Sequence, residues 1–183
     1  MRTRAFPIAV FLGLCFIFTG AQADAKKQKA SKPKTSSGMV SATMPDPDGN
    51  PKVHAEVGWI IAPAQKQGTV TRTYKSYYEN TVIVYEGKDA EHRTEIMRCG
   101  NGSNQTRNME QKLEGGKQYI LAAWHKADDP DGRYNRSELP WLPSRLAIEP
   151  SPTGYYVRID DSRPGTGEGD KDYNDLVLTI TFE

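Results

Sequence analysis

"LVLTITFE", residues 176–183, carries the clearest strand signal in the chain. Large apolar side chains occupy alternate positions, at Leu176, Leu178, Ile180 and Phe182. The positions between them hold valine and threonine, so one face of the segment is apolar and the other is mixed. This period of two is typical of a β-strand with one buried face.

Similar segments precede it, each rich in Val, Ile, Thr or Tyr and separated from the next by turn residues. They cover residues 52–61, 68–75, 80–87, 91–99, 115–125, 145–150 and 154–161. No stretch sustains a helical period between caps. Eight or so short strands predict an all-β domain with an antiparallel β-sandwich, and a jelly-roll-like arrangement is the nearest alternative.

Residues 1–23 have the features of a secretory signal peptide. Arg2 and Arg4 give a basic start, "FPIAVFLGLCFIF" is apolar, and "AQA" at residues 21–23 offers the small side chains of a cleavage site. The apolar run is too short to span a membrane comfortably, and no second one follows. We expect a secreted or periplasmic protein without a membrane span.

Residues 24–38 follow as a lysine-rich leader without large apolar side chains, which predicts a disordered spacer. The folded domain is expected over residues 39–183. Once the segments before it are set aside, that domain has 17 basic and 22 acidic side chains, a net charge of about −5. Such an acidic balance argues against nucleic acid as a partner and favours a cation. Cys99 is then the single cysteine, so no intramolecular disulfide is possible, and we interpret it as a small buried residue rather than a nucleophile.

"GDKDYNDL", residues 169–176, gathers oxygen-bearing side chains immediately before the last strand. They are Asp170, Asp172, Asn174 and Asp175. In an extended segment alternate side chains point the same way, so the first three should converge. Asp161 and, less firmly, Asp160 end the preceding strand and should lie close to them. Clustered carboxylates with a neutral amide are hard ligands that suit Ca²⁺, whereas a turn chosen for geometry alone would explain one or two of them.

The stretch "GTGEGDKDYNDLVLTITF" resembles the signature of a bacterial calcium-binding domain of unknown function, found in secreted and surface proteins. The signature pairs two acidic residues, matched by Asp160 and Asp161, with a GGGDxDxNDLV loop. Glu168 stands at the middle glycine of that loop and is a further candidate ligand. The resemblance implies that Ca²⁺ is bound here.

The D-x-D-Y-N-D core is also similar to the loop of two-calcium bacterial lectins that bind fucose and mannose. In that family the ions coordinate sugar hydroxyls. This second resemblance implies a carbohydrate or a cell-surface polysaccharide as the partner.

The longest interruption between strands, residues 126–144, holds the other candidate ligand-binding residues. Trp141 lies between two prolines, with Tyr134 earlier in the same loop and His125 at the end of the strand before it. An aromatic ring held by prolines can stack on a sugar, or it can close the end of the sandwich. His125 can support a cation site or be a plain strand-end residue.

Motifs of the common hydrolases and nucleotide-binding enzymes are absent from the sequence, and we expect no catalytic activity. The function that the sequence favours is a calcium-binding, lectin-like module. The alternative is a surface or matrix module in which calcium is structural and a protein partner binds elsewhere. The sequence leaves the sugar, the number of ions and the oligomeric state open.

Overall fold

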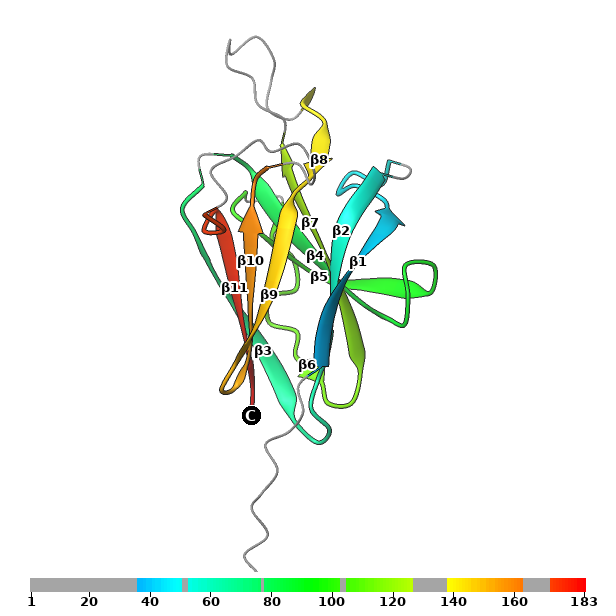
Figure 1. The fold of residues 1–183 in the computed structure, drawn as a ribbon, viewed down its shortest axis with the longest axis vertical. Coiled ribbons are helices and arrows are strands. Elements are labelled where there is room, and N and C mark those ends of the chain that lie inside the picture. Colours follow the sequence, from blue (N-terminus) through cyan, green and yellow to red (C-terminus); the bar gives the residue numbers. More distant parts are fainter. Residues whose placement is uncertain (1–35, 51–52, 77, 103–104, 127–137, 163–171) are drawn as a thin grey trace, which may run out of the picture. The chain divides into compact units, whose positions relative to one another are not determined.

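A computed structural model describes residues 36–50, 53–76, 78–102, 105–126, 138–162 and 172–183. Two antiparallel sheets pack face to face and enclose the main core (Figure 1). This arrangement confirms the predicted all-β sandwich. Among the described residues, no helix is long and apolar enough to cross a membrane.

The first sheet has six strands. Its order is β1 (Ser36–Met44), β2 (Val53–Ile61), β7 (Gln118–Lys126), β4 (Asn80–Gly87) and β5 (Arg93–Gly100), with β8 (Trp141–Pro143) paired to the end of β7. The second sheet has five strands. Its order is β6 (Leu113–Glu114), β3 (Gln67–Tyr74), β11 (Leu176–Phe182), β10 (Gly154–Asp160) and β9 (Arg145–Ser151).

The strand predicted at residues 176–183 is β11, and it lies in the middle of the second sheet between β10 and β3. Its alternate apolar side chains, Leu176, Leu178, Ile180 and Phe182, are all buried in the main core as predicted. The intervening side chains of β11 are only partly buried. Hydrophobic burial along one face therefore fixes the register of this central strand.

The sequence placed the start of the domain too late. Residues 36–38 were assigned to the disordered leader, but they begin β1, where Ser36 pairs with Ile61 and Gly38 pairs with Trp59. The segment has few large apolar residues, so its pairing with β2 rather than its own pattern defines it as a strand. The short strands β6 and β8 were also missed.

The first sheet carries apolar side chains on both faces. A second cluster on its outer face is made of Met44, Ala55, Val57, Ile83, Tyr85, Ile120, Ala122, Trp124 and Trp141. The turn after β1 reaches over toward β5, where the Arg98 guanidinium donates a 2.6 Å hydrogen bond to the carbonyl of Pro47. Cys99, next along β5, is enclosed in the main core, and burial raises the pKa of its thiol to about 12. This placement agrees with a structural role for the cysteine.

Candidate metal centre

The end of β10 and the start of β11 bring acidic residues together at one end of the second sheet. The ladder between the two strands finishes at the pair Ile159 and Leu176. One further step of the same antiparallel register sets Asp160 opposite Asp175, and Asp161 follows directly. Like charges in opposed positions of a sheet repel one another, so this arrangement needs a compensating positive charge.

Asp160, Asp161 and Asp175 each offer a carboxylate oxygen, and the three oxygens lie within 4.8 Å of one another. Two oxygens bound to the same Ca²⁺ at 2.3–2.6 Å cannot be more than about 5 Å apart. The three carboxylates are therefore spaced as ligands of a single ion need to be.

Asp160 is the most unusual member of this acidic cluster. Its side chain is fully buried, and Oδ1 accepts a 3.0 Å hydrogen bond from the backbone N–H of Ser162. Oδ2 is also buried and has no hydrogen-bond partner among the described residues, and the same holds for the hydroxyl of Ser162. A buried carboxylate oxygen without a partner is costly, so it marks a position where a cation fits.

Asp175 joins the cluster to two neighbouring segments. Its Oδ2 accepts a 2.8 Å hydrogen bond from the backbone N–H of Asp161, and its carbonyl accepts from the backbone N–H groups of Lys75 and Ser76. Desolvation, followed by repulsion from Asp161, Asp172 and Asp160, raises the pKa of Asp175 to about 6, although the hydrogen bond from Asp161 opposes the rise. Ionisation of the Asp175 carboxyl is therefore unfavourable when no cation is nearby.

The segment between β3 and β4 supports the cluster from the side. The Ser76 hydroxyl lies 2.9 Å from Oδ2 of Asp161 and accepts hydrogen bonds from the backbone N–H of Tyr78 and from Nδ2 of Asn80. Asn80 is fully buried, and its backbone N–H donates a 2.7 Å hydrogen bond to Oδ1 of Asn101. This support could not be predicted from the sequence, because nothing in the polar run between the two strands indicates that it contacts Asp161 and Asp175.

The predicted convergence of the acidic loop differs in part from what the structure shows. Asp172 and Asn174 form a local turn, in which Oδ1 of Asp172 accepts the backbone N–H of Asn174 at 3.1 Å and the Asn174 amide contacts Oδ2. Tyr173 between them has a positive φ of 52°, so the segment is not extended there. The prediction that alternate side chains of an extended loop point the same way therefore does not hold at this residue. The predicted ligands Asp170 and Glu168 lie outside the described residues.

Trp141 and His125, which were predicted to bind a sugar, are both buried. Trp141 is only 3 % exposed, packs in the outer cluster of the first sheet, and has the Lys126 ammonium 4.4 Å from its ring centroid. His125 is buried, with Nδ1 3.0 Å from the hydroxyl of Ser144. Tyr134 lies outside the described residues. The burial of Trp141 favours the alternative in which this ring closes the sandwich.

No family model, no curated protein and no solved structure matches this chain.

Proposed function

We propose that the protein is an exported calcium-binding β-sandwich module whose ion is held by Asp160, Asp161 and Asp175. The observation that carries the proposal is the fully buried Asp160 carboxylate, whose Oδ2 has no partner among the described residues although two more carboxylates lie within 4.8 Å. A divalent cation supplies the charge that this group of oxygens lacks.

The donor set favours calcium among the common cations. All three residues of the cluster offer carboxylate oxygens, and the buried Ser162 hydroxyl is available as a neutral oxygen donor beside them. Hard oxygen ligands of this kind suit Ca²⁺ or Mg²⁺ rather than zinc or copper. Ca²⁺ accepts many protein oxygens in a flexible geometry, whereas Mg²⁺ keeps most of its waters.

A structural role for the ion has the better support. The ion would neutralise the opposed carboxylates of β10 and β11 and hold Asp161 where Ser76 contacts it, which ties this end of the second sheet to the β3–β4 segment. Direct coordination of a sugar has less support, since Asp160 is enclosed and Trp141, one of the proposed stacking rings, is buried. We therefore favour the surface or matrix module with structural calcium over the lectin in which the ion contacts the sugar.

Thermal unfolding of the full chain tests the proposal, with Asp160→Asn as the variant and Asp89→Asn, an exposed carboxylate on the β4–β5 hairpin, as its matched control. Sites of this kind bind calcium at roughly 10⁻⁴ to 10⁻³ M, so about 10 mM Ca²⁺ should raise the midpoint by several degrees. Asp89→Asn should respond like the wild type.

Asp160→Asn removes the buried negative charge while keeping the shape of the side chain. We expect it to unfold at the same or a higher temperature than the wild type without calcium, and to gain nothing from added calcium. If Ca²⁺ raises the unfolding midpoint equally in Asp160→Asn and the wild type, or in neither, the proposed calcium site is wrong. The function proposed on the basis of that site is then wrong as well.

A further inference from the structure

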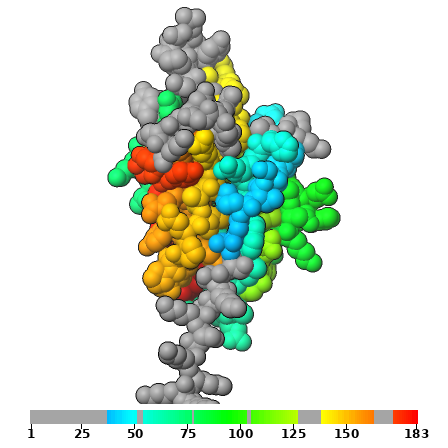
Figure 2. Space-filling model, viewed as in Figure 1, coloured from blue at the N-terminus to red at the C-terminus, as the bar shows by residue number. Residues whose placement is uncertain are grey.

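A cleft of about 370 Å³ lies on the outer face of the first sheet, and its lining residues Val57 and Ile120 belong to the outer cluster of that sheet. Its floor includes Val57, Trp59 and Ile120 of β2 and β7, and its wall is the hairpin of residues 87–93 that joins β4 to β5. Figure 2 shows this hairpin projecting beside β1 and β2. The cleft shares no residue with the acidic cluster.

Trp59 gives the floor a flat aromatic surface. It is the partly exposed tryptophan of the three in the chain, since Trp124 and Trp141 are buried. A Cβ built on Gly38, its direct cross-strand partner, would lie 2.7 Å from each of Cε2, Cζ2 and Nε1 of the indole. Equal distances to three adjoining ring atoms mean that one ring face lies against Gly38, which leaves the opposite face turned away from β1. A glycine in mid-strand allows this close approach and holds the ring in one orientation.

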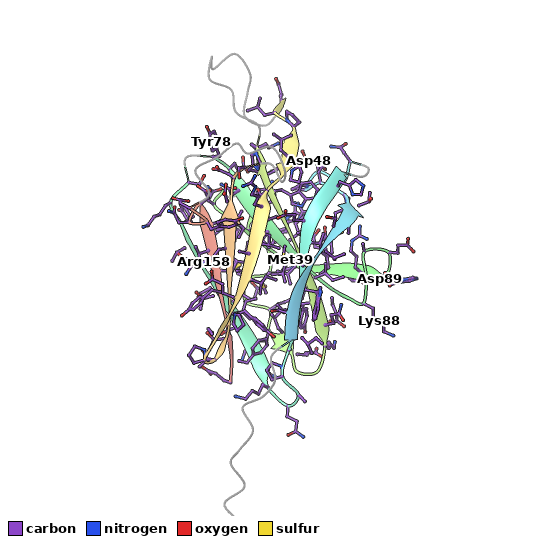
Figure 3. The ribbon with its side chains drawn as sticks, viewed as in Figure 1. Met39, Asp48, Tyr78, Lys88, Asp89 and Arg158 are labelled. Atoms are coloured by element: carbon purple, nitrogen blue, oxygen red, sulfur yellow. The ribbon has the colours of Figure 1, made fainter. Side chains whose placement is uncertain are left out.

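The wall of the cleft is held in a fixed conformation. Oδ1 of Asp89 accepts hydrogen bonds from the backbone N–H groups of Glu91 and His92, at 2.9 and 2.8 Å, which closes the tip of the hairpin. Nε2 of Gln118, on β7, donates a 3.0 Å hydrogen bond to the carbonyl of Lys88 and so ties the hairpin to the sheet. Figure 3 places Lys88 and Asp89 on the hairpin, to one side of Met39 on β1. A preformed cleft of this kind loses little entropy when it binds a ligand.

The charges around the cleft are mostly compensated. Lys117, which lines the adjoining open cleft of about 960 Å³, pairs with Glu86 and Glu114 at 2.9 Å each. Asp89 is already engaged by His92 at 3.0 Å. Lys88 is the exception, because its ammonium has no ion pair among the described residues. The Lys88 ammonium is therefore free to donate hydrogen bonds to the hydroxyl oxygens of a ligand in this cleft.

We propose that the cleft binds a neutral hexopyranose unit of a polysaccharide, with the C–H face of the sugar against Trp59 and its hydroxyls bonded by Gln118 and Lys88. A pyranose ring presents an apolar C–H face and a rim of hydroxyls, which match an exposed indole beside amide and ammonium groups. The volume falls within the range of small-ligand sites.

Intrinsic fluorescence tests the proposal, because acrylamide should quench Trp59 selectively while Trp124 and Trp141 are enclosed. The full chain is titrated with gluco-, manno-, galacto- and chito-oligosaccharides in millimolar Ca²⁺, and calorimetry gives the affinities. We expect oligosaccharides of one of these four sugars to reduce the acrylamide quenching of Trp59 fluorescence severalfold. Lys88→Ala and Gln118→Ala should each weaken that binding about tenfold, as the loss of one hydrogen bond does.

Trp59→Phe tests the stacking surface, and Tyr156→Ala is its control, since Tyr156 is an exposed aromatic residue on the other sheet. The first variant should bind much more weakly and the second like the wild type. The proposal is overturned if no oligosaccharide protects Trp59, or if Trp59→Phe binds with unchanged affinity. Repeating the titration with EDTA separates it from the calcium site. If EDTA abolishes oligosaccharide binding while circular dichroism shows that the sandwich is still folded, the sugar binds at the calcium ion, and the proposal for the cleft is wrong.

Discussion

The backbone N–H of Asp161 donates a 2.8 Å hydrogen bond to Oδ2 of Asp175, across the ends of two neighbouring strands. This bond holds one carboxylate of the acidic cluster in place while the other carboxylates repel it. A single backbone donor opposes the rise in the pKa of Asp175 without cancelling it, and the pKa still stands at about 6. The carboxylates at this end of the second sheet are therefore already positioned close together in the ion-free protein, where a cation would reduce their repulsion.

Protonation of Asp175 should control the stability of the calcium-free protein in mildly acidic solution. The pKa of this carboxyl is about 6 in the folded chain and 3.8 as its ordinary value, so between these pH values the folded state holds more protons than the unfolded state. The free energy of unfolding should then fall as the pH rises from about 4 to about 6. Urea unfolding in metal-free buffer across this range measures the slope.

Two comparisons check the origin of that slope. Asp175→Asn cannot titrate, so its stability should depend less on pH over the same window. Saturating Ca²⁺ favours the ionised carboxylate in the folded state, and it should flatten or reverse the slope of the wild type. A slope that is the same in Asp175→Asn and the wild type would show that other groups cause it.

Removal of the Ser76 hydroxyl should weaken both the fold and the proposed calcium site. Ser76→Ala removes the Oγ acceptor of the Tyr78 backbone N–H and leaves Nδ2 of Asn80 with a longer hydrogen bond of 3.4 Å to the carbonyl of Tyr78. Oδ2 of Asp161 also loses its 2.9 Å hydrogen bond from Ser76. Unsatisfied buried groups cost about 1–3 kcal/mol in the free energy of unfolding. Ser41→Ala, at an exposed position on β1, should change it by less than about 0.5 kcal/mol. Calorimetric Ca²⁺ titration adds a second readout, and an unchanged affinity in Ser76→Ala would separate this serine from the ion.

Trp141 should behave as a core residue. Its ring is 3 % exposed and packs beside Trp124, so Trp141→Ala should lower the free energy of unfolding by about 3–5 kcal/mol. Tyr74→Ala, which removes an aromatic side chain that is 53 % exposed, should cost far less. Urea unfolding of the two variants side by side makes the comparison. If both variants lose only a similar, small amount of unfolding free energy, Trp141 is not a core residue and is again a candidate for ligand binding.

The Cys99 thiol should be inert in the folded protein. Its side chain is fully buried, and a pKa of about 12 leaves almost no thiolate at neutral pH. In a Cys15→Ser chain, where Cys99 is the single thiol, Ellman's reagent at pH 8 should therefore react slowly with the native protein and at once in guanidinium chloride. Rapid reaction of the native chain would revive the interpretation of Cys99 as a nucleophile.

The sequence predicted what depends on local pattern and missed what depends on distant partners. The alternation at residues 176–183 identified β11 and its buried face, and the acidic pair before it located Asp160 and Asp161 at the neighbouring strand end. The role of Ser76 could not be predicted, since it follows from the pairing of β3 with β11. The turn at Tyr173 was missed because a positive φ there leaves no mark in the residue types.

Trp141 and Trp59 show the same limit. Prolines on either side of Trp141 suggested a loop tip, yet its pairing with Lys126 across β7 and β8 encloses the ring. Trp59 lies on the same face of β2 as the buried Val57 but is only partly buried, and its register opposite Gly38 sets one ring face against β1. Sequence pattern cannot assign either ring to core or surface without the strand order.

The central position of β11 bears on how the chain assembles. Its partner β3 precedes it by roughly a hundred residues, so half of its backbone hydrogen bonds wait for a long loop to close. Until residues 176–182 arrive, β3 and β10 each present an unpaired edge, which is a hazard for aggregation. The second sheet therefore stays incomplete between β3 and β10 until this distant strand has been made and has paired with both.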